Sequence, residues 1–234
     1  MHIFYSNSYD GSIFTLDEPE SIHLSRVLRL RPGDVATVIN GSGSLYNCRV
    51  IEAGKKLSKL EVVSVTQNYN KRDYYLHIAI APTKNIDRFE WFIEKSVEIG
   101  VDKITPLICE RSERRVIKTL RSRKIIISAM KQSLKASNTI ISEAASFDTV
   151  IDNCSESYRF IAHCNDMGKQ EKPNGLIKAD SDGLVLIGPE GDFTDDEVNK
   201  AVDKGFKELN LGPSRLRTET AGIIACSMYY FINL

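Results

Sequence analysis

The chain has 234 residues, of which 42% are hydrophobic and 26% charged, a balance that excludes wholesale disorder and favours one large or two modest domains. No apolar run reaches the roughly 18 residues that would span a bilayer, and the N-terminus lacks the pattern of a secretory leader, so we expect no membrane contact. The five cysteines are scattered and form no C-x-x-C pair, and only four histidines are present. We therefore expect no metal site and a reducing, cytoplasmic location.

The charges sum to zero but are unevenly distributed along the chain. Between Lys103 and Lys135 there are ten Lys or Arg and only two Asp or Glu, and seven of the ten fall between Arg111 and Lys124. Arginine matches the geometry of phosphate oxygens, so this basic stretch favours a nucleic-acid surface. A solvated helix face would have the same composition, and the residues alone leave both interpretations open.

The first 67 residues are predicted to be mostly β. Residues 35–39, 45–51 and 60–65 are rich in β-branched side chains, and Asn40-Gly41-Ser42-Gly43 is typical of a hairpin turn. A short helix is expected between residues 18 and 30. Residues 68–73 are polar and aperiodic, and we place the domain boundary there, giving domains 1–70 and 71–234.

The second domain alternates between strand and helix patterns. Strands are expected at 74–81, 103–108, 159–163, 184–187 and 206–211, and helices at 86–99, 120–136, 195–204 and 218–231. Thr194-Asp195-Asp196-Glu197 is typical of a capping box, which begins a helix. Such alternation predicts an α/β domain with a mostly parallel sheet covered on both faces.

Two glycine- and proline-containing segments follow predicted strands, at residues 186–193 and 211–221. Neither a G-x-G-x-x-G fingerprint, a phosphate-binding P-loop nor a G-x-S-x-G nucleophile elbow is present. In open α/β sheets, ligands bind beyond the carboxyl ends of the strands, and glycine lets the backbone approach a ligand closely. Together the segments favour a backbone-lined pocket, although each alone would also fit a tight strand-to-helix turn.

The motifs Gly188-Pro189-Glu190-Gly191, Leu211-Gly212-Pro213 and Leu216-Arg217-Thr218-Glu219-Thr220-Ala221 closely resemble the SPOUT superfamily of knotted methyltransferases. More narrowly, the chain resembles the RsmE family, which methylates N3 of a uridine in 16S ribosomal RNA. The resemblance covers nearly the whole chain. It implies a PUA-like, RNA-binding β-barrel over residues 1–70 and a SPOUT α/β trefoil-knot domain over residues 71–234.

The resemblance also implies the residues of the site. The knotted loops are expected to bind S-adenosylmethionine through Leu186, Gly188, Glu190, Gly191, Leu211, Gly212, Leu216, Arg217, Thr218 and, from the third loop, His163 with Cys164. Candidates for contact with 16S rRNA in the small ribosomal subunit are Arg26, Arg29, Lys84, Arg111, Arg114, Arg115, Lys118, Gln132 and Lys135.

Methyl transfer to N3 needs a proton acceptor and a positive group that stabilises the uracil anion. Glu190 and Glu219 are the candidate acceptors, and the candidates for the positive group are Arg217, Arg111 and Arg115; for each glutamate, a role in stabilising its loop fits equally well. The family works as a homodimer, and the apolar C-terminal helix fits either a dimer interface or simple core burial.

Four positions depart from the family pattern. Asp192 stands where the family usually has a second glycine, Lys135 where it usually has an arginine, Asn138 near a usual proline and Ile3 near a usual arginine. The departures at Asp192 and Lys135 keep open an RNA-binding relative without catalytic activity. A second alternative within the superfamily is a SPOUT methyltransferase that acts on another RNA.

Overall fold

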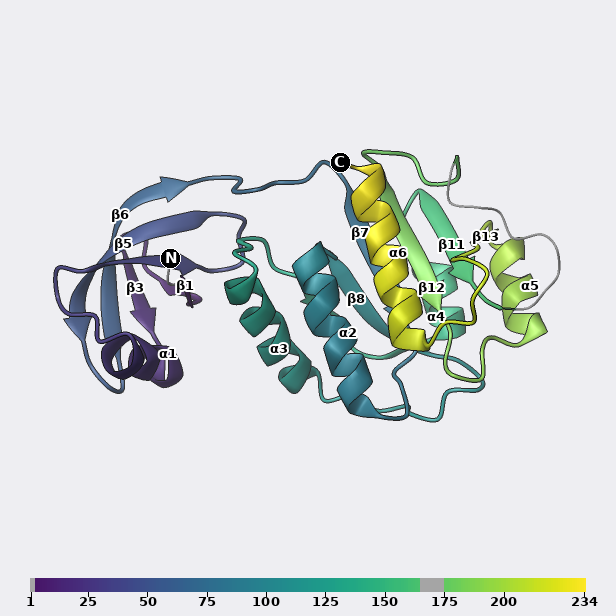
Figure 1. Ribbon diagram of the computed structural model, residues 1–234, viewed down its shortest axis with the longest axis horizontal. Helices are drawn as coiled ribbons and strands as arrows, with labels where there is room; N and C mark the ends of the chain where they lie inside the picture. Colours follow the sequence, from purple (N-terminus) through teal and green to yellow (C-terminus); the bar gives the residue numbers. More distant parts are fainter. Residues whose placement is uncertain (1–2, 165–174) are drawn as a thin grey trace. The chain divides into compact units, whose positions relative to one another are not determined.

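The computed structural model describes residues 3–164 and 175–234, and the chain divides into two compact units. One unit contains the chain up to Lys71 together with Ile127–Asn138, and the other contains Arg72–Ile126 and Thr139–Leu234. Each unit has its own sheet (Figure 1). The structure thus adds to the N-terminal unit a segment, residues 127–138, that the sequence pattern assigned to the C-terminal domain.

The N-terminal unit contains a six-stranded sheet in the order β1-β4-β5-β6-β3-β2. Its strands are β1 (Ile3–Tyr5), β2 (Ser8–Tyr9), β3 (Ile13–Leu16), β4 (Val35–Ile39), β5 (Leu45–Ala53) and β6 (Ser58–Thr66). Phe4, Phe14, Leu24, Val38 and Leu60 are fully buried in one core. Along β3, buried residues alternate with partly exposed ones, as expected for a strand with one face on a core. This unit confirms the expectation of a mostly β N-terminal part.

The predicted hairpin turn joins β4 to β5, and Gly41 and Gly43 both take positive φ angles there, of 82° and 85°. The turn also forms hydrogen bonds with residues 136–138, which come from the second half of the chain. The amide of Asn138 donates to the carbonyl of Gly41, and the amide of Gly43 donates to the carbonyl of Ala136. The helix expected between 18 and 30 forms as α1 (Glu18–Ile22), followed by one π-helical turn (His23–Val27).

The C-terminal unit contains a parallel sheet in the order β10-β8-β7-β12-β11-β13, with β9 paired to β8. Its strands are β7 (Tyr75–Ile80), β8 (Lys103–Ile108), β9 (Ile140–Ile141), β10 (Ala145–Ser146), β11 (Tyr158–Ala162), β12 (Asp182–Ile187) and β13 (Lys207–Glu208). The predicted parallel sheet is confirmed, but β13 is shorter than the expected strand at 206–211.

Helices cover both faces of this sheet, as expected. They are α2 (Ile86–Ile99), α4 (Phe147–Asn153), α5 (Asp195–Asp203) and α6 (Thr218–Ile232). A further helix, α3 (Thr119–Gln132), begins in this unit and ends in the N-terminal unit. In Figure 1, α2 and α6 lie side by side in front of the sheet, while α4 and α5 contribute to a core on its other face. A Cβ atom at Gly222 of α6 would lie 2.6 Å from the ring of Phe92, so only glycine permits this close approach to α2. No helix within residues 3–164 and 175–234 is long and apolar enough to cross a membrane.

Helix ends follow their local sequence signals. The side chain of Asn85 accepts from the amide of Asp87 at the start of α2, and Gly100 ends that helix at a φ of 125°. Thr194 and Glu197 form the predicted capping box of α5. By contrast, α3 ends at Gln132, four residues earlier than expected.

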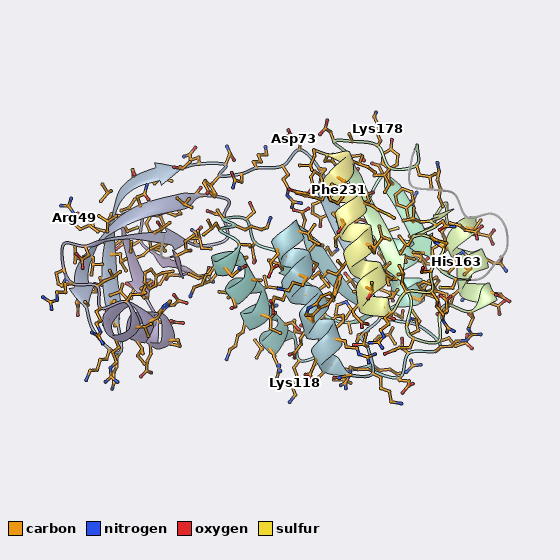
Figure 2. The ribbon with its side chains drawn as sticks, in the orientation of Figure 1. Arg49, Asp73, Lys118, His163, Lys178 and Phe231 are labelled. Carbon is orange, nitrogen blue, oxygen red and sulfur yellow. The ribbon has the colours of Figure 1, made fainter. Side chains whose placement is uncertain are left out.

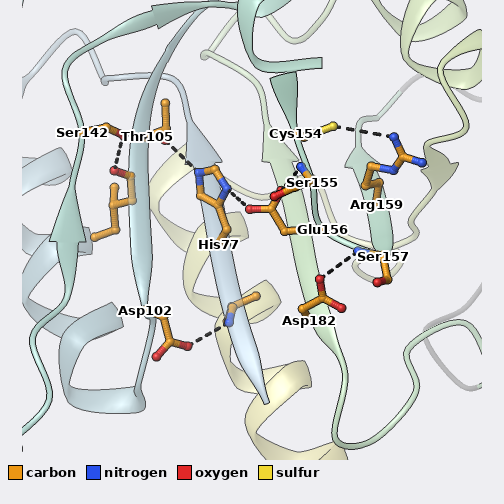
Figure 3. A network of polar contacts seen from close by, with 12 residues as sticks. His77, Asp102, Thr105, Ser142, Cys154, Ser155, Glu156, Ser157, Arg159 and Asp182 are labelled. Carbon is orange, nitrogen blue, oxygen red and sulfur yellow. Dashed lines mark hydrogen bonds and ion pairs between the residues drawn. The ribbon is translucent and has the colours of Figure 1, made fainter. Parts of the chain in front are cut away.

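A polar network crosses the interior of the C-terminal sheet (Figure 3). The imidazole of His77 lies 2.7 Å from Glu156 through Nδ1 and 2.8 Å from the Thr105 hydroxyl through Nε2, and Thr105 lies 2.7 Å from the Ser142 hydroxyl. Burial lowers the pKa of His77. Burial opposes a charge on Glu156 and is the largest single influence, but the hydrogen bond and the charge interaction with His77, together with a backbone hydrogen bond and the charge of Lys103, outweigh it and lower the pKa of Glu156 to about 2. A neutral imidazole therefore donates to an ionised carboxylate.

This network predicts a loss of stability in acid. A carboxyl group with a lowered pKa in the folded state contributes stability above its ordinary pKa of 4.5, and that contribution is lost as the pH falls toward about 2. His77 acts in the same direction, because only the unfolded chain takes up its proton readily below its ordinary pKa of 6.5. The free energy of unfolding, measured with urea between pH 7 and pH 3, should fall steadily.

The variant Glu156→Gln should show a flatter dependence below pH 5, because the amide does not titrate. Glu113→Gln, which changes an exposed carboxylate elsewhere in the same unit, serves as the control and should keep the slope of the unmodified protein. Equal slopes for Glu156→Gln and the unmodified protein would contradict the assignment.

Candidate functional site

A cavity of about 850 Å³ opens at the carboxyl ends of the parallel strands. Three loops form its wall: residues 162–164 after β11, residues 187–192 after β12 and residues 210–218 after β13. Arg111 and Ala221 complete the lining. The volume lies within the range of about 300–1,000 Å³ that is typical of small-molecule sites. The position matches the edge at which ligands bind in open parallel sheets.

Most of the predicted cofactor-binding residues lie in this wall. They are His163, Gly188, Glu190, Gly191, Leu211, Gly212, Leu216, Arg217 and Thr218. Leu186 does not lie there, because its side chain is fully buried in the core between the sheet and α4 and α5. Its neighbour Ile187, the last residue of β12, contributes to the wall instead. The two motifs that are far apart in the sequence thus face one cavity.

Three glycines, Gly188, Gly191 and Gly212, line the wall, and two of them have specific geometric reasons. A Cβ atom at Gly188 would lie 3.1 Å from the ring of Phe193, so this position favours glycine. Gly212 adopts a φ of 123°, which strains any residue with a side chain. The hydroxyl of Thr218 donates to the carbonyl of Gly188 at 3.1 Å, so the first residue of α6 holds the loop after β12.

Asp192 takes the conformation that a glycine would be expected to supply. Its φ is 61°, in the left-handed region that Asp tolerates better than most residues. Its carboxylate accepts from the amide of Phe193 at 2.8 Å and from the amide of Cys164, also at 2.8 Å. The departure from the family pattern therefore keeps the backbone turn and adds a link between the loops after β12 and β11.

The loop after β11 is held from its other side by a buried histidine. His163 Nε2 lies 2.8 Å from Oε2 of Glu208 in β13, and the His163 side chain is fully buried. Burial, followed by the charge of Asp192, raises the pKa of Cys164, so its thiol is protonated at neutral pH. Among the residues that the structure describes, no three His, Cys, Asp or Glu side chains gather as metal ligands.

Part of the basic stretch bonds to the loops at this edge of the sheet. Arg111 donates to the carbonyls of Gly191 and Phe193 at 2.9 and 3.3 Å. Arg115, a candidate for the catalytic positive group, donates to the carbonyl of Glu110 at 3.0 Å.

Arg114 and Glu190 meet at the loop after β7. Arg114 donates from Nε to the carbonyl of Thr83 at 3.1 Å and from a terminal nitrogen to the carbonyl of Lys84 at 2.8 Å. Oε1 of Glu190 accepts from the amide of Lys84 at 2.9 Å. The Lys84 ammonium forms an exposed ion pair with Glu113 at 2.8 Å.

Other cations point into solvent. Lys118, Arg123 and Lys124 are exposed, and their side chains have no hydrogen-bond or ion-pair partner within the described ranges; Figure 2 labels Lys118. Arg121 differs, because it forms an ion pair with Glu90 at 2.5 Å. In the N-terminal unit, Arg26, Arg29 and Gln132 are exposed, while Lys135 is partly buried.

Sequence reasoning missed several residues of the wall. Ala162 and Asn210 belong to no motif, so no signal in one sequence could have identified them, whereas Ala221 ends a quoted motif but was not named as a cofactor-binding residue. Arg111 was expected at an RNA surface, yet it also lines the cavity. The role of Asp192 could have been inferred, because Asp is among the few residues other than glycine that are frequent at positive φ.

The conformation of Asp192 predicts an order of stability among its variants. Asp192→Gly should lose the two carboxylate bonds but keep the turn, whereas Asp192→Ala should lose the bonds and also strain the backbone by about 1 kcal/mol. Urea unfolding should therefore rank the unmodified protein above Asp192→Gly and Asp192→Gly above Asp192→Ala. Asp203→Ala at an exposed helix position is the control and should change little. An alanine variant as stable as the glycine variant would contradict the left-handed turn.

Comparisons with known proteins agree with this architecture. The RNA methyltransferase domain family matches residues 70–230, and the RNA methyltransferase PUA domain family matches residues 16–63. The ribosomal RNA small subunit methyltransferase E of Aquifex aeolicus is 29% identical over 233 residues, covering 97% of this chain and 98% of the relative.

Two solved structures resemble the whole chain. A probable rRNA-methyltransferase from Porphyromonas gingivalis is 40% identical with a TM-score of 0.92, covering 100% of this chain and 98% of that chain. A ribosomal RNA small subunit methyltransferase E from Neisseria gonorrhoeae, bound to S-adenosyl methionine, is 27% identical with a TM-score of 0.89 and the same coverage. These likenesses confirm the predicted fold class, a PUA-like domain followed by an α/β methyltransferase domain. The chain belongs to the RNA methyltransferase family, in the group of the ribosomal RNA small subunit methyltransferases E.

Proposed function

We propose that this protein is an S-adenosylmethionine-dependent methyltransferase that methylates N3 of a uridine in the 16S RNA of the small ribosomal subunit. The observation that carries the proposal is the cavity between the loops after β12 and β13, lined by the two motifs of the family. The S-adenosyl methionine bound to the Neisseria relative supports the choice of cofactor. An enzyme that acts on ribosomal RNA would work in the cytoplasm.

The residues of the cavity fit this cofactor. Gly212 leaves open space where a Cβ atom would point, and Gly188 and Gly191 line the cavity without side chains of their own. Backbone groups of residues 188–191 and 211–216 would hold the adenosyl and methionine parts, with Leu211 and Leu216 supplying apolar contact. When bound there, S-adenosylmethionine supplies an electrophilic methyl group.

Arg217 is the side chain best placed to stabilise the uracil anion. It precedes α6, lines the cavity and is exposed, and its guanidinium has no hydrogen-bond or ion-pair partner in the described part of the chain. A free guanidinium at the cavity would stabilise negative charge that develops on O2 or O4 when N3 loses its proton. Arg115 is less suited, because it already donates to the carbonyl of Glu110.

The direct test is mass spectrometry of ribosomal RNA. 16S RNA from a deletion strain should lack one methyl group on a uridine, and the purified protein with S-adenosylmethionine should restore it at N3. If the protein methylates a different RNA instead, it would be another SPOUT methyltransferase. If it binds the cofactor or RNA but transfers no methyl group, it would be a non-catalytic relative. Either result would overturn the proposed activity.

The exposed cations of the basic stretch should contact RNA phosphates. Replacing Lys118 and Lys124 together by alanine should weaken RNA binding and reduce the dependence of log K on log salt by about 1.4, because each lost phosphate contact on a single strand removes about 0.7. Cofactor affinity should not change, because neither residue lines the cavity. Filter binding at several salt concentrations measures the slope.

A variant with the same change in charge provides the control. Lys178 and Lys207 are exposed lysines of the same unit, outside the basic stretch, and their double alanine variant should keep the original slope. Equal slopes for both double variants would mean that the basic stretch is a solvated face.

We further propose that the protein acts as a homodimer through α6. Phe231 is 69% exposed and Tyr230 39% exposed on this helix, and Trp91 is 45% exposed on the neighbouring α2. Together they leave large aromatic side chains on the outer side of the helix pair, and such patches favour association between identical chains.

Light scattering should give about twice the chain mass of 26.3 kDa. Phe231→Glu should produce a monomer with little methylation activity. Val63→Glu, at another exposed apolar residue in the N-terminal unit, should leave the dimer intact. A fully active monomer at micromolar concentration would contradict the proposal.

A further inference from the structure

Three neighbouring parallel strands end at the same edge of the C-terminal sheet. They are β8, β7 and β12, and the loops that follow them are residues 109–115, 82–85 and 188–193. Backbone groups in these loops have left the sheet and need other hydrogen-bond partners. Arg111, Arg114 and Glu190 supply those partners, and each of them bonds to a loop other than its own.

The loop after β8 is the fixed member of the three. The hydroxyl of Ser112 accepts from the amide of Cys109 at 2.9 Å and closes a tight turn. Oε1 of Glu197, the capping-box residue of α5, accepts from the amide of Glu110 at 2.9 Å. The two arginines therefore extend from a loop that is tied to α5.

From this loop the arginines reach in two directions. Arg111 bonds to the loop after β12, through the carbonyls of Gly191 and Phe193. Arg114 bonds to the loop after β7, through the carbonyls of Thr83 and Lys84.

Glu190 closes the third side. It belongs to the loop after β12, and its carboxylate accepts from the amide of Lys84 in the loop after β7, at 2.9 Å. The loop after β7 is thus held at adjacent backbone groups, with Arg114 on the carbonyl of Lys84 and Glu190 on its amide. The wall of the cavity and the loop that carries the Lys84 ammonium are joined by this contact.

We propose that Glu190 is a positioning residue that, together with Arg114, fixes the loop after β7 against the cofactor loop, and that it is not the proton acceptor for the uridine. This inference rests on the proposed function wherever it refers to cofactor and RNA. The loop clamp, defined as Arg114, Glu190 and the backbone of Lys84, acts on the shape of the cavity wall and on the placement of Lys84.

Glutamine separates the two roles of Glu190. The amide oxygen of Glu190→Gln can still accept from the Lys84 amide, but it cannot take up a proton from uridine. Alanine removes both capacities. For Arg114, lysine keeps the charge but lacks the planar arrangement of donors that reaches two adjacent carbonyls, so Arg114→Lys should not restore what Arg114→Ala loses.

The experiment compares these variants with Glu113→Ala, which removes the carboxylate that contacts the Lys84 side chain instead of its backbone. Three quantities are measured: hydrogen exchange of the Lys84 amide, the Kd for S-adenosylmethionine by calorimetry without RNA, and kcat for methylation. Glu190→Ala and Arg114→Ala should speed amide exchange and raise the Kd, each by about tenfold for the loss of one or two hydrogen bonds.

Glu190→Gln should lie much closer to the unmodified protein than Glu190→Ala does in amide exchange, in Kd and in kcat. Glu113→Ala should match the unmodified protein in amide exchange and in Kd. Thermal unfolding of each variant shows whether it is folded, and Glu190→Gln allows the comparison even if an alanine variant is unstable.

Two results would overturn the inference. One is a Glu190→Gln variant with an unchanged Kd but a kcat as low as that of Glu190→Ala, which would identify a proton acceptor. The other is unchanged exchange of the Lys84 amide in Glu190→Ala, which would show that the clamp does not exist. If the proposed function is wrong, the unmodified protein will bind no S-adenosylmethionine. Amide exchange needs neither cofactor nor RNA, so it still tests the loop clamp in that case.

Discussion

The need to satisfy backbone groups beyond the ends of parallel strands determines the architecture of the site. A parallel sheet pairs the backbone of β7, β8 and β12, but the loops that follow lie where no further strand can pair with them. Arg111, Arg114 and Glu190 bond to their carbonyls and amides from neighbouring loops, and Asp192 bonds in the same way to the loop after β11. Since these loops form or adjoin the cavity wall, its shape depends on side chains that do not need to touch a ligand.

This constraint explains why the basic stretch has two parts. Arg111 and Arg114 follow β8 directly and bond to backbone carbonyls, whereas Lys118 and Lys124 lie further along the chain and are exposed. The guanidinium group suits the first task because it presents several donors in one plane, and the ammonium group suits a phosphate contact that needs only charge. The count of ten cations between residues 103 and 135 does not distinguish these roles, because composition says nothing about which carbonyls lie nearby.

Local patterns predicted those parts of the fold that local forces determine. The helix that begins after Asn85 and ends at Gly100, the capping box at Thr194 and the hairpin turn at Gly41 were all predictable, because each depends on residues within a few positions. Strands of two residues such as β13 have no periodicity to detect. The return of residues 127–138 to the N-terminal unit also left no sequence signal, because it depends on bonds such as that from Asn138 to Gly41, far away in the chain.

The parts of the site that could be predicted are those where the backbone conformation or close packing requires a glycine. Gly188 and Gly212 are required by close packing and by a positive φ, and such requirements appear in the sequence as glycine. Asp192 shows the limit of that reasoning: its side chain would suggest a charge for a ligand, yet the structure uses it to hold a left-handed turn and to bond to the amide of Cys164. A carboxylate in this wall therefore cannot be assigned a chemical role from its charge alone. Both carboxylate oxygens of Asp192 already accept from amides, those of Phe193 and Cys164, and one oxygen of Glu190 accepts from the amide of Lys84. Mutation has to separate these hydrogen bonds from a role in proton transfer.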